Sequence, residues 1–180
     1  MKTRLLSCAL IAVALASSSC ASKPPPKWAS GGTQMVVSAA RWTRGDSAVE
    51  VRQDGKVTID GDEVFGIDAA GRVFEVDGDP MAVLDEAGHL LGRDAAEMGM
   101  VGAQTAAFPG SATAWVGLGP RGEVIRFDSD GERSRDGYWQ GCSGAMSTTC
   151  MLVTHVILLR EWQRRPRVGV GIGFGVGIMH

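Results

Sequence analysis

Short apolar segments separated by glycine-containing turns recur along the middle of this chain. In Val51-Arg-Gln-Asp-Gly55-Lys-Val57, an apolar residue is followed by a four-residue turn ending in glycine, one spacer and a second apolar residue. Similar turns end at Gly71, Gly88, Gly122 and Gly131. Aspartate at the first turn position accepts local backbone hydrogen bonds, and glycine at the fourth adopts a left-handed conformation at low cost. The pattern predicts type I turns with a glycine bulge, which commonly connect antiparallel strands.

The spacing of these turns predicts a repeating unit of two short strands. The glycines at 55, 71, 88 and 122 are separated by 16, 17 and 34 residues, so a decayed unit is expected near Thr105. Segments between the turns, such as Arg72-Val-Phe-Glu-Val76, are short and rich in strand-forming residues. We therefore predict a mainly β protein, in which residues 34–137 form an antiparallel meander curled into a roll or small barrel.

The last part of the chain, residues 138–180, has a different pattern. Met151–Leu159 is apolar without Gly or Pro, and its β-branched residues favour a buried strand, although its length also allows a helix. Val168–Ile178 alternates strictly between glycine and apolar residues, which puts five glycines on one face of a strand. We predict a disulfide-bearing loop followed by a C-terminal β-hairpin with an arginine-rich turn.

The glycine face of this arm is a candidate interaction surface, because interior glycine weakens a strand unless something approaches the backbone closely. A tryptophan side chain, a partner chain or a membrane could each cover it. The candidate interaction residues are Arg164, Arg165, Arg167, Gly169, Gly171, Gly173, Gly175 and Gly177.

The N-terminus carries a targeting pattern. A basic start is followed by a mainly apolar run from Leu5 to Ala16, then by small residues and Cys20. The run is too short for a confident membrane span, which needs about 20 apolar residues. This arrangement resembles a bacterial lipoprotein precursor. The resemblance implies that residues 1–19 are a signal peptide, that Cys20 carries palmitate-like acyl chains, and that the protein is held at a membrane of the cell envelope.

The residues on either side of Cys20 also bear on the localisation. By the same resemblance, Ala21-Ser22 without an aspartate favours the outer membrane, with the domain facing the periplasm or the surface. An ordinary secretory signal cut between Ala16 and Ala21 is the alternative.

Residues 20–33 contain Pro24-Pro25-Pro26 and Gly31-Gly32, which predicts a semi-rigid tether. It would precede a single β domain at 34–180.

The four cysteines divide by position. Cys8 leaves with the signal peptide and Cys20 takes lipid, so Cys142 and Cys150 remain. A pair outside the cytoplasm tends to oxidise, and we predict a disulfide between them.

Charge is distributed unevenly. The net charge is −2, and it becomes −4 when Lys2 and Arg4 are lost with the signal peptide. Residues 46–97 hold fourteen acids against four bases, which turn chemistry alone can explain. Residues 133–167 hold six arginines against two acids. The overall acidity and the compartment argue against nucleic acid as a partner.

Few residues suggest catalysis, metal binding or cofactor binding. Ser143 lies near a hydrolase-like motif and His155 could serve it as a base, but the spacing lacks the second glycine of a nucleophile elbow. The scattered histidines and acids predict no metal site and no cofactor. We predict a non-catalytic envelope lipoprotein, acting as a structural or interaction module that contacts an envelope protein or polymer. A Ser143/His155 hydrolase and a small-ligand carrier are the alternatives.

Overall fold

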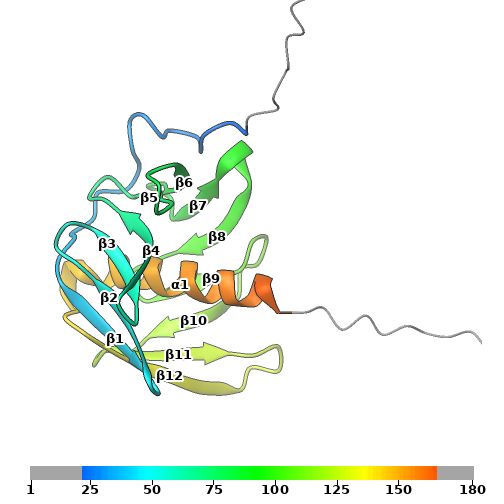
Figure 1. Cartoon of the computed structure of the whole chain (residues 1–180). Helices are drawn as coiled ribbons and strands as arrows, with labels where there is room; N and C mark the ends of the chain where they lie inside the picture. The colour runs from blue at the N-terminus through cyan, green and yellow to red at the C-terminus, as the bar shows by residue number, and fades with distance from the viewer. Residues whose placement is uncertain (1–21, 166–180) are drawn as a thin grey trace, which may run out of the picture.

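Twelve antiparallel strands form a closed barrel in the computed structural model, which describes residues 22–165 (Figure 1). Each strand pairs with its neighbours in sequence, and β1 closes the barrel against β12. The strands are β1 (Ala40–Arg44), β2 (Ser47–Val51), β3 (Lys56–Ile59), β4 (Asp62–Ile67), β5 (Arg72–Phe74), β6 (Pro80–Leu84), β7 (His89–Gly92), β8 (Glu97–Val101), β9 (Thr105–Ala107), β10 (Ala114–Leu118), β11 (Glu123–Phe127) and β12 (Arg133–Gln140). Two short 3-10 helices, η1 (Arg93–Ala95) and η2 (Gly144–Met146), and the helix α1 (Ser147–Arg164) complete the fold. The predicted mainly β small barrel is confirmed.

The glycine turns close hairpins as predicted. Gly55, Gly71, Gly88 and Gly122 have φ angles of 85°, 72°, 87° and 86°. Each donates its N–H to the carbonyl three residues earlier, as Gly88 does to Asp85 across 3.0 Å. The aspartates act as turn acceptors, since Oδ1 of Asp85 accepts from the N–H groups of Ala87 and His89. Part of the acidity of residues 46–97 is therefore turn chemistry.

The decayed repeat near Thr105 is also a hairpin. There the connection between β8 and β9 is short, and Gly102 donates its N–H to the Thr105 carbonyl across 2.8 Å. The carbonyl of Gln104 accepts from Leu118 at 2.7 Å, as the carbonyl of Gly88 accepts from Val101 at 2.7 Å. Gln104 thus occupies the place that glycine holds in the neighbouring units.

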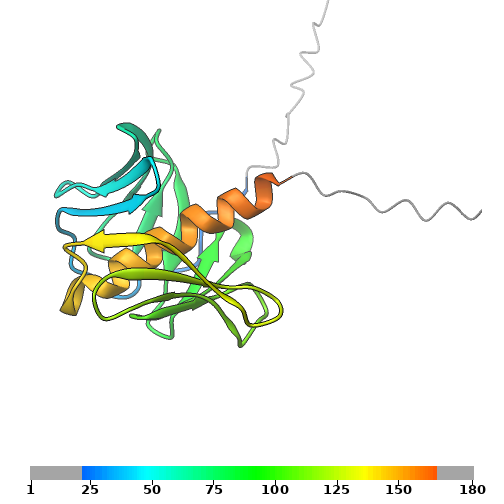
Figure 2. The ribbon, with the colours of Figure 1, turned by 90° about the horizontal axis from the view of Figure 1, so that it is seen from below.

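The segment predicted as the first strand of a C-terminal hairpin is helical instead. α1 runs through the barrel, and every residue from Thr149 to Leu159 is buried (Figure 2). An apolar run longer than the usual strand favours a helix, and a helix satisfies its own backbone groups inside a barrel whose strands are already paired with one another. Length therefore outweighed the β-branched residues. The second predicted strand, at 168–178, lies outside the described residues.

The barrel core is built around this helix. Inward-facing residues of the strands, among them Trp42, Phe65, Leu84 and Leu90, are fully buried with Leu152 of α1. Polar atoms of the helix find partners in the wall. Thr154 Oγ1 accepts the indole hydrogen of Trp139 at 2.8 Å and donates to the Cys150 carbonyl at 2.7 Å. Across residues 22–165, no helix is long and apolar enough to cross a membrane.

The predicted tether is folded onto the barrel from Lys23 onward. Pro25 is buried, and residues 26–30 form turns. Further along, Gly32 donates to the Ala70 carbonyl and Thr33 to the Leu84 carbonyl, each at 2.8 Å. We call residues 23–35 the N-terminal strap. Proline disfavours regular pairing but not packing, and Trp28 anchors the strap by meeting the Phe74 ring edge-on at 4.9 Å between centroids.

The barrel has two distinct ends. α1 begins at one end, and the turns ending in Gly55, Gly71 and Gly88 lie there. α1 ends at the opposite end, which we call the exit rim. The exit rim comprises the connections at 45–46, 60–61, 75–79, 93–96, 108–113 and 128–132 and the last turn of α1.

Candidate binding surface

The outer face of the β11–β12 hairpin gathers arginine and aromatic side chains. Successive residues of a strand point to opposite faces, and Val124 and Trp139 are buried in the core. Glu123, Ile125 and Phe127, which alternate with Val124, therefore lie on the outer face. A register shift between Arg135 and Tyr138 of β12 brings Arg133, Arg135 and Tyr138 onto the same face. In the register of the pair, Phe127 lies opposite Arg133, Ile125 opposite Arg135 and Glu123 opposite Tyr138. We call these six residues the arginine face.

Aromatic rings support both arginines. The guanidinium of Arg133 lies 5.7 Å from the Phe127 ring centroid, and that of Arg135 lies 5.2 Å from the Tyr138 ring. Such cation–π contacts contribute about 0.5–1 kcal/mol at exposed sites and restrict the rotamers of a long side chain. Within the described part of the chain, neither arginine forms a salt bridge. Their charges are exposed, held by the rings and available to a partner.

The one carboxylate of the arginine face is already engaged. Glu123 accepts from the backbone N–H of Arg121 at 3.0 Å and from its guanidinium at 2.9 Å. The backbone N–H of Glu123 itself is the largest of the hydrogen-bonding influences that lower the pKa of this carboxyl group, followed by the groups of Arg121. Glu123 therefore stays ionised and balances Arg121, which leaves Arg133 and Arg135 uncompensated.

A hollow of about 350 Å³ lies beside these arginines. It is lined by residues 119–121, Glu123, Ile125 and residues 133–135. A larger hollow of about 690 Å³ lies over β1, β2 and the end of β12. There Arg41 pairs with Glu50 and Arg52 with Asp54, so its charges cancel. The smaller hollow is the better candidate binding site, because its net positive charge favours anionic groups.

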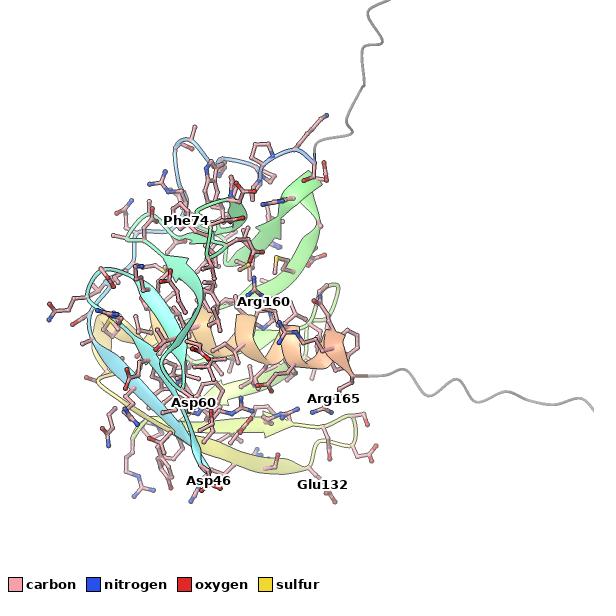
Figure 3. The ribbon with its side chains drawn as sticks, viewed as in Figure 1. Asp46, Asp60, Phe74, Glu132, Arg160 and Arg165 are labelled. Atoms are coloured by element: carbon pink, nitrogen blue, oxygen red, sulfur yellow. A yellow bond between two sulfur atoms is a disulfide. The ribbon has the colours of Figure 1, made fainter. Side chains whose placement is uncertain are left out.

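The predicted arginines at the end of the chain are only partly described. Arg164 and Arg165 are exposed at the last turn of α1, where Figure 3 labels Arg165 on the same side of the barrel as the Glu132 turn. Arg167 and the five predicted glycines lie beyond the described residues, as does Cys20. The interaction surface predicted for the glycine arm therefore stays a prediction.

The predicted disulfide is present. Cys142 and Cys150 are bridged with their Cα atoms 6.0 Å apart. Because Cys142 follows β12 and Cys150 lies in the first turns of α1, the bridge joins the barrel wall to the start of the helix.

The alternative hydrolase site is not assembled. Ser143 is exposed before α1, whereas His155 is fully buried within it. Both ring nitrogens of His155 have core partners, namely Trp115 Nε1 at 3.0 Å from Nδ1 and the Met98 carbonyl at 2.8 Å from Nε2. Neither ring nitrogen of His155 is therefore free to act as a base for Ser143.

The barrel interior is packed with side chains, which argues against a ligand carrier. Val57, Phe65 and Leu84, which a cavity would expose, are buried against other side chains. In the described residues, no group of three or more His, Cys, Asp or Glu side chains is arranged to hold a metal ion.

The excess of arginine at 133–167 is evident in the sequence, but the arginine face is not. The available signal was the Arg133-Ser-Arg135 alternation, which places two cations on one face of any strand. Recognising it required placing a strand at 133–140.

No protein-family model matches this chain, and neither a curated protein nor a solved structure proved similar to it.

Proposed function

We propose that this protein is a non-catalytic lipoprotein of the cell envelope that binds an acidic partner protein through the arginine face. Cys20 is its lipid anchor, and the outer membrane is its site. The observation that carries the proposal is the pair Arg133 and Arg135, exposed, supported by aromatic rings and lacking carboxylate partners within the described residues.

Binding at the surface follows from how the barrel is filled. α1 occupies the interior, and its residues from Thr149 to Leu159 are buried. Space for chemistry or cargo would have to be found on the outside, where the described hollows are open. An interaction module needs no interior space, and it gains from a rigid wall that holds surface side chains in place.

The composition of the arginine face suits a protein partner. Arginine and aromatic residues are enriched where interfaces bind most strongly, and Tyr138 is 41% exposed. Ile125 and Phe127 add apolar area between the charges. Two uncompensated arginines require carboxylates opposite them, because a charge buried in an interface without a partner is costly.

Photocrosslinking in the native cells tests this proposal. A photoreactive amino acid replaces Tyr138 in one variant and Ala87 in a control variant. Ala87 is exposed in the β6–β7 turn on another part of the barrel. We expect a discrete protein adduct from position 138, none from position 87, and loss of the adduct when R133E and R135E are added.

Two results would contradict the proposal. Equal adducts from both positions, or an adduct that survives the charge reversal, would show that the arginine face is not the binding surface. An adduct that collapses on digestion with glycan hydrolases would identify an envelope polymer in place of a protein. Measuring the thermal unfolding of each variant ensures that all of them are folded.

A further inference from the structure

The N-terminal strap fixes where the proposed lipid anchor leaves the barrel. The backbone N–H of Lys23 donates to Oδ1 of Asp94 at 2.9 Å, and the N–H of Asp94 donates to the Lys23 carbonyl at 3.0 Å. Asp94 lies in the β7–β8 connection of the exit rim. This reciprocal pair holds the chain at the exit rim, and the strap then runs along the barrel towards the opposite end.

Very little chain separates this point from Cys20. Only Ala21 and Ser22 lie between Cys20 and Lys23. Three extended residues reach about 11 Å at most, at up to about 3.6 Å each. Lipid on Cys20 would therefore hold the exit rim itself close to the bilayer, with no spacer in between.

The helix reaches the same side of the molecule. Figures 1 and 2 show both ends of the described chain leaving on one side of the barrel. Ion pairs tie the helix end to the wall there: Arg44 on β1 bonds Asp136 of β12 at 3.0 Å and Glu161 of α1 at 3.1 Å. The last turn of α1 is thus a fixed part of the exit rim.

Side chains suited to a membrane surface stand at this helix end. Trp162 is 45% exposed, and its ring lies 5.2 Å from that of Phe108. Arg164 and Arg165 follow it and are exposed. Tryptophan with neighbouring arginine is typical of the membrane–water interface, where the ring lies among headgroups and the cation meets phosphate.

The other charges of the exit rim limit how deep the contact can be. Exposed carboxylates stand on most connections of the exit rim, namely Asp46, Asp60, Asp77, Asp79, Asp94, Asp128, Asp130 and Glu132. Carboxylates enter hydrocarbon at high cost, so the rim would rest on the headgroups without inserting.

We propose that the exit rim lies against the lipid bilayer, with Trp162, Arg164 and Arg165 contacting lipid headgroups. This inference rests on the proposed anchoring at Cys20. It orients the barrel, so that the strands run away from the membrane and the opposite end faces the surrounding space.

Quenching of tryptophan fluorescence by brominated lipid tests the orientation. The mature protein, purified with detergent from its native cells, is reconstituted into phosphatidylcholine vesicles, with and without bromine on the acyl chains. We expect quenching in the wild type and loss of most of it in W162F. W28F is the matched control, because Trp28 belongs to the strap and packs on Phe74, and it should retain the quenching.

The outcomes separate the two proposals. If the protein fails to float with vesicles, the anchor itself is absent and the proposed function fails. Protein that floats but shows no bromine quenching, or the same quenching in W162F as in the wild type, would overturn the orientation alone. A second measurement needs no variant: aqueous iodide should quench the wild type less on vesicles than in detergent, and equal quenching would also overturn the proposal.

Discussion

Trp115 donates its indole hydrogen to Nδ1 of His155 across 3.0 Å in the barrel core. Because an indole nitrogen only donates, Nδ1 must be the acceptor, and Nε2 carries the proton that it donates to the Met98 carbonyl at 2.8 Å. The wall of the barrel therefore selects one neutral tautomer of a histidine in its central helix. Protonation of Nδ1 would break the bond to Trp115 and put a charge in the core.

This arrangement predicts a pH dependence of stability. Burial lowers the pKa of His155 from its ordinary 6.5, and the Met98 carbonyl opposes the shift only in part. Below pH 6.5 the unfolded chain binds a proton that the folded protein resists, so stability should be complete above pH 6.5 and fall as the pH drops towards the folded pKa. One proton can change the unfolding free energy by at most about 1.4 kcal/mol per pH unit. Urea unfolding between pH 5 and 7.5 measures the slope.

His155→Gln is the control for that experiment. Glutamine can accept from Trp115 and donate to a carbonyl without titrating. The variant should lose the slope between pH 5 and 6.5. A slope that persists unchanged would show that other groups cause it.

The disulfide is expected to stabilise the fold by restricting the unfolded chain. Closing the short loop from Cys142 to Cys150 predicts about 2–3 kcal/mol. The double variant Cys142→Ala/Cys150→Ala should unfold at correspondingly lower urea, and reductant should destabilise the wild type while leaving the variant unchanged. A wild type that is insensitive to reductant, once loss of the bridge is verified, would contradict this account.

Two turn glycines with similar conformations allow the cost of backbone strain to be distinguished from the cost of a steric clash. Gly122 and Gly131 have φ angles of 86° and 80°. A Cβ on Gly131 would meet nothing within 4 Å, whereas one on Gly122 would collide with the Trp139 carbonyl oxygen. Gly131→Ala should cost about 1–2 kcal/mol for the left-handed conformation alone. Gly122→Ala should cost at least about 1 kcal/mol more, because overpacking is added. Equal unfolding free energies would refute the close approach.

A similar pair concerns buried hydroxyl groups. Within residues 22–165, Thr58 Oγ1 is buried without a hydrogen-bond partner. Thr58→Val should therefore be neutral or stabilise by up to about 1 kcal/mol, since it removes an unsatisfied polar atom. Thr154→Val should destabilise by about 1–3 kcal/mol, because it leaves the Trp139 indole without its acceptor. The opposite order in chemical denaturation would contradict the assigned bonds.

The sequence predicted the barrel wall well because its turns are local. Asp85 and Gly88 form their turn through hydrogen bonds between residues close together in the sequence, so the turn does not depend on the rest of the fold. The regular spacing of the turn glycines also predicted a decayed unit near Thr105, where the β8–β9 hairpin lies.

Tertiary features were harder to predict. The local pattern of Met151–Leu159 is ambiguous, because its β-branched residues favour a strand and its length favours a helix. The closed wall around it, which the local pattern does not reveal, favours the helix. The strap likewise depends on Pro25 and Trp28 meeting a barrel formed elsewhere in the chain. The arginine face required the register of β11 with β12, which sets Arg135 opposite Ile125.

Mass spectrometry of the mature protein extracted from native membranes tests the central claim of a lipid-anchored module most directly. We predict an N-terminal peptide that begins at Cys20 and carries acyl chains on its sulfur and amine, recovered with the outer membrane. An unmodified N-terminus between Ser17 and Ser22, recovered in the soluble fraction, would contradict the account.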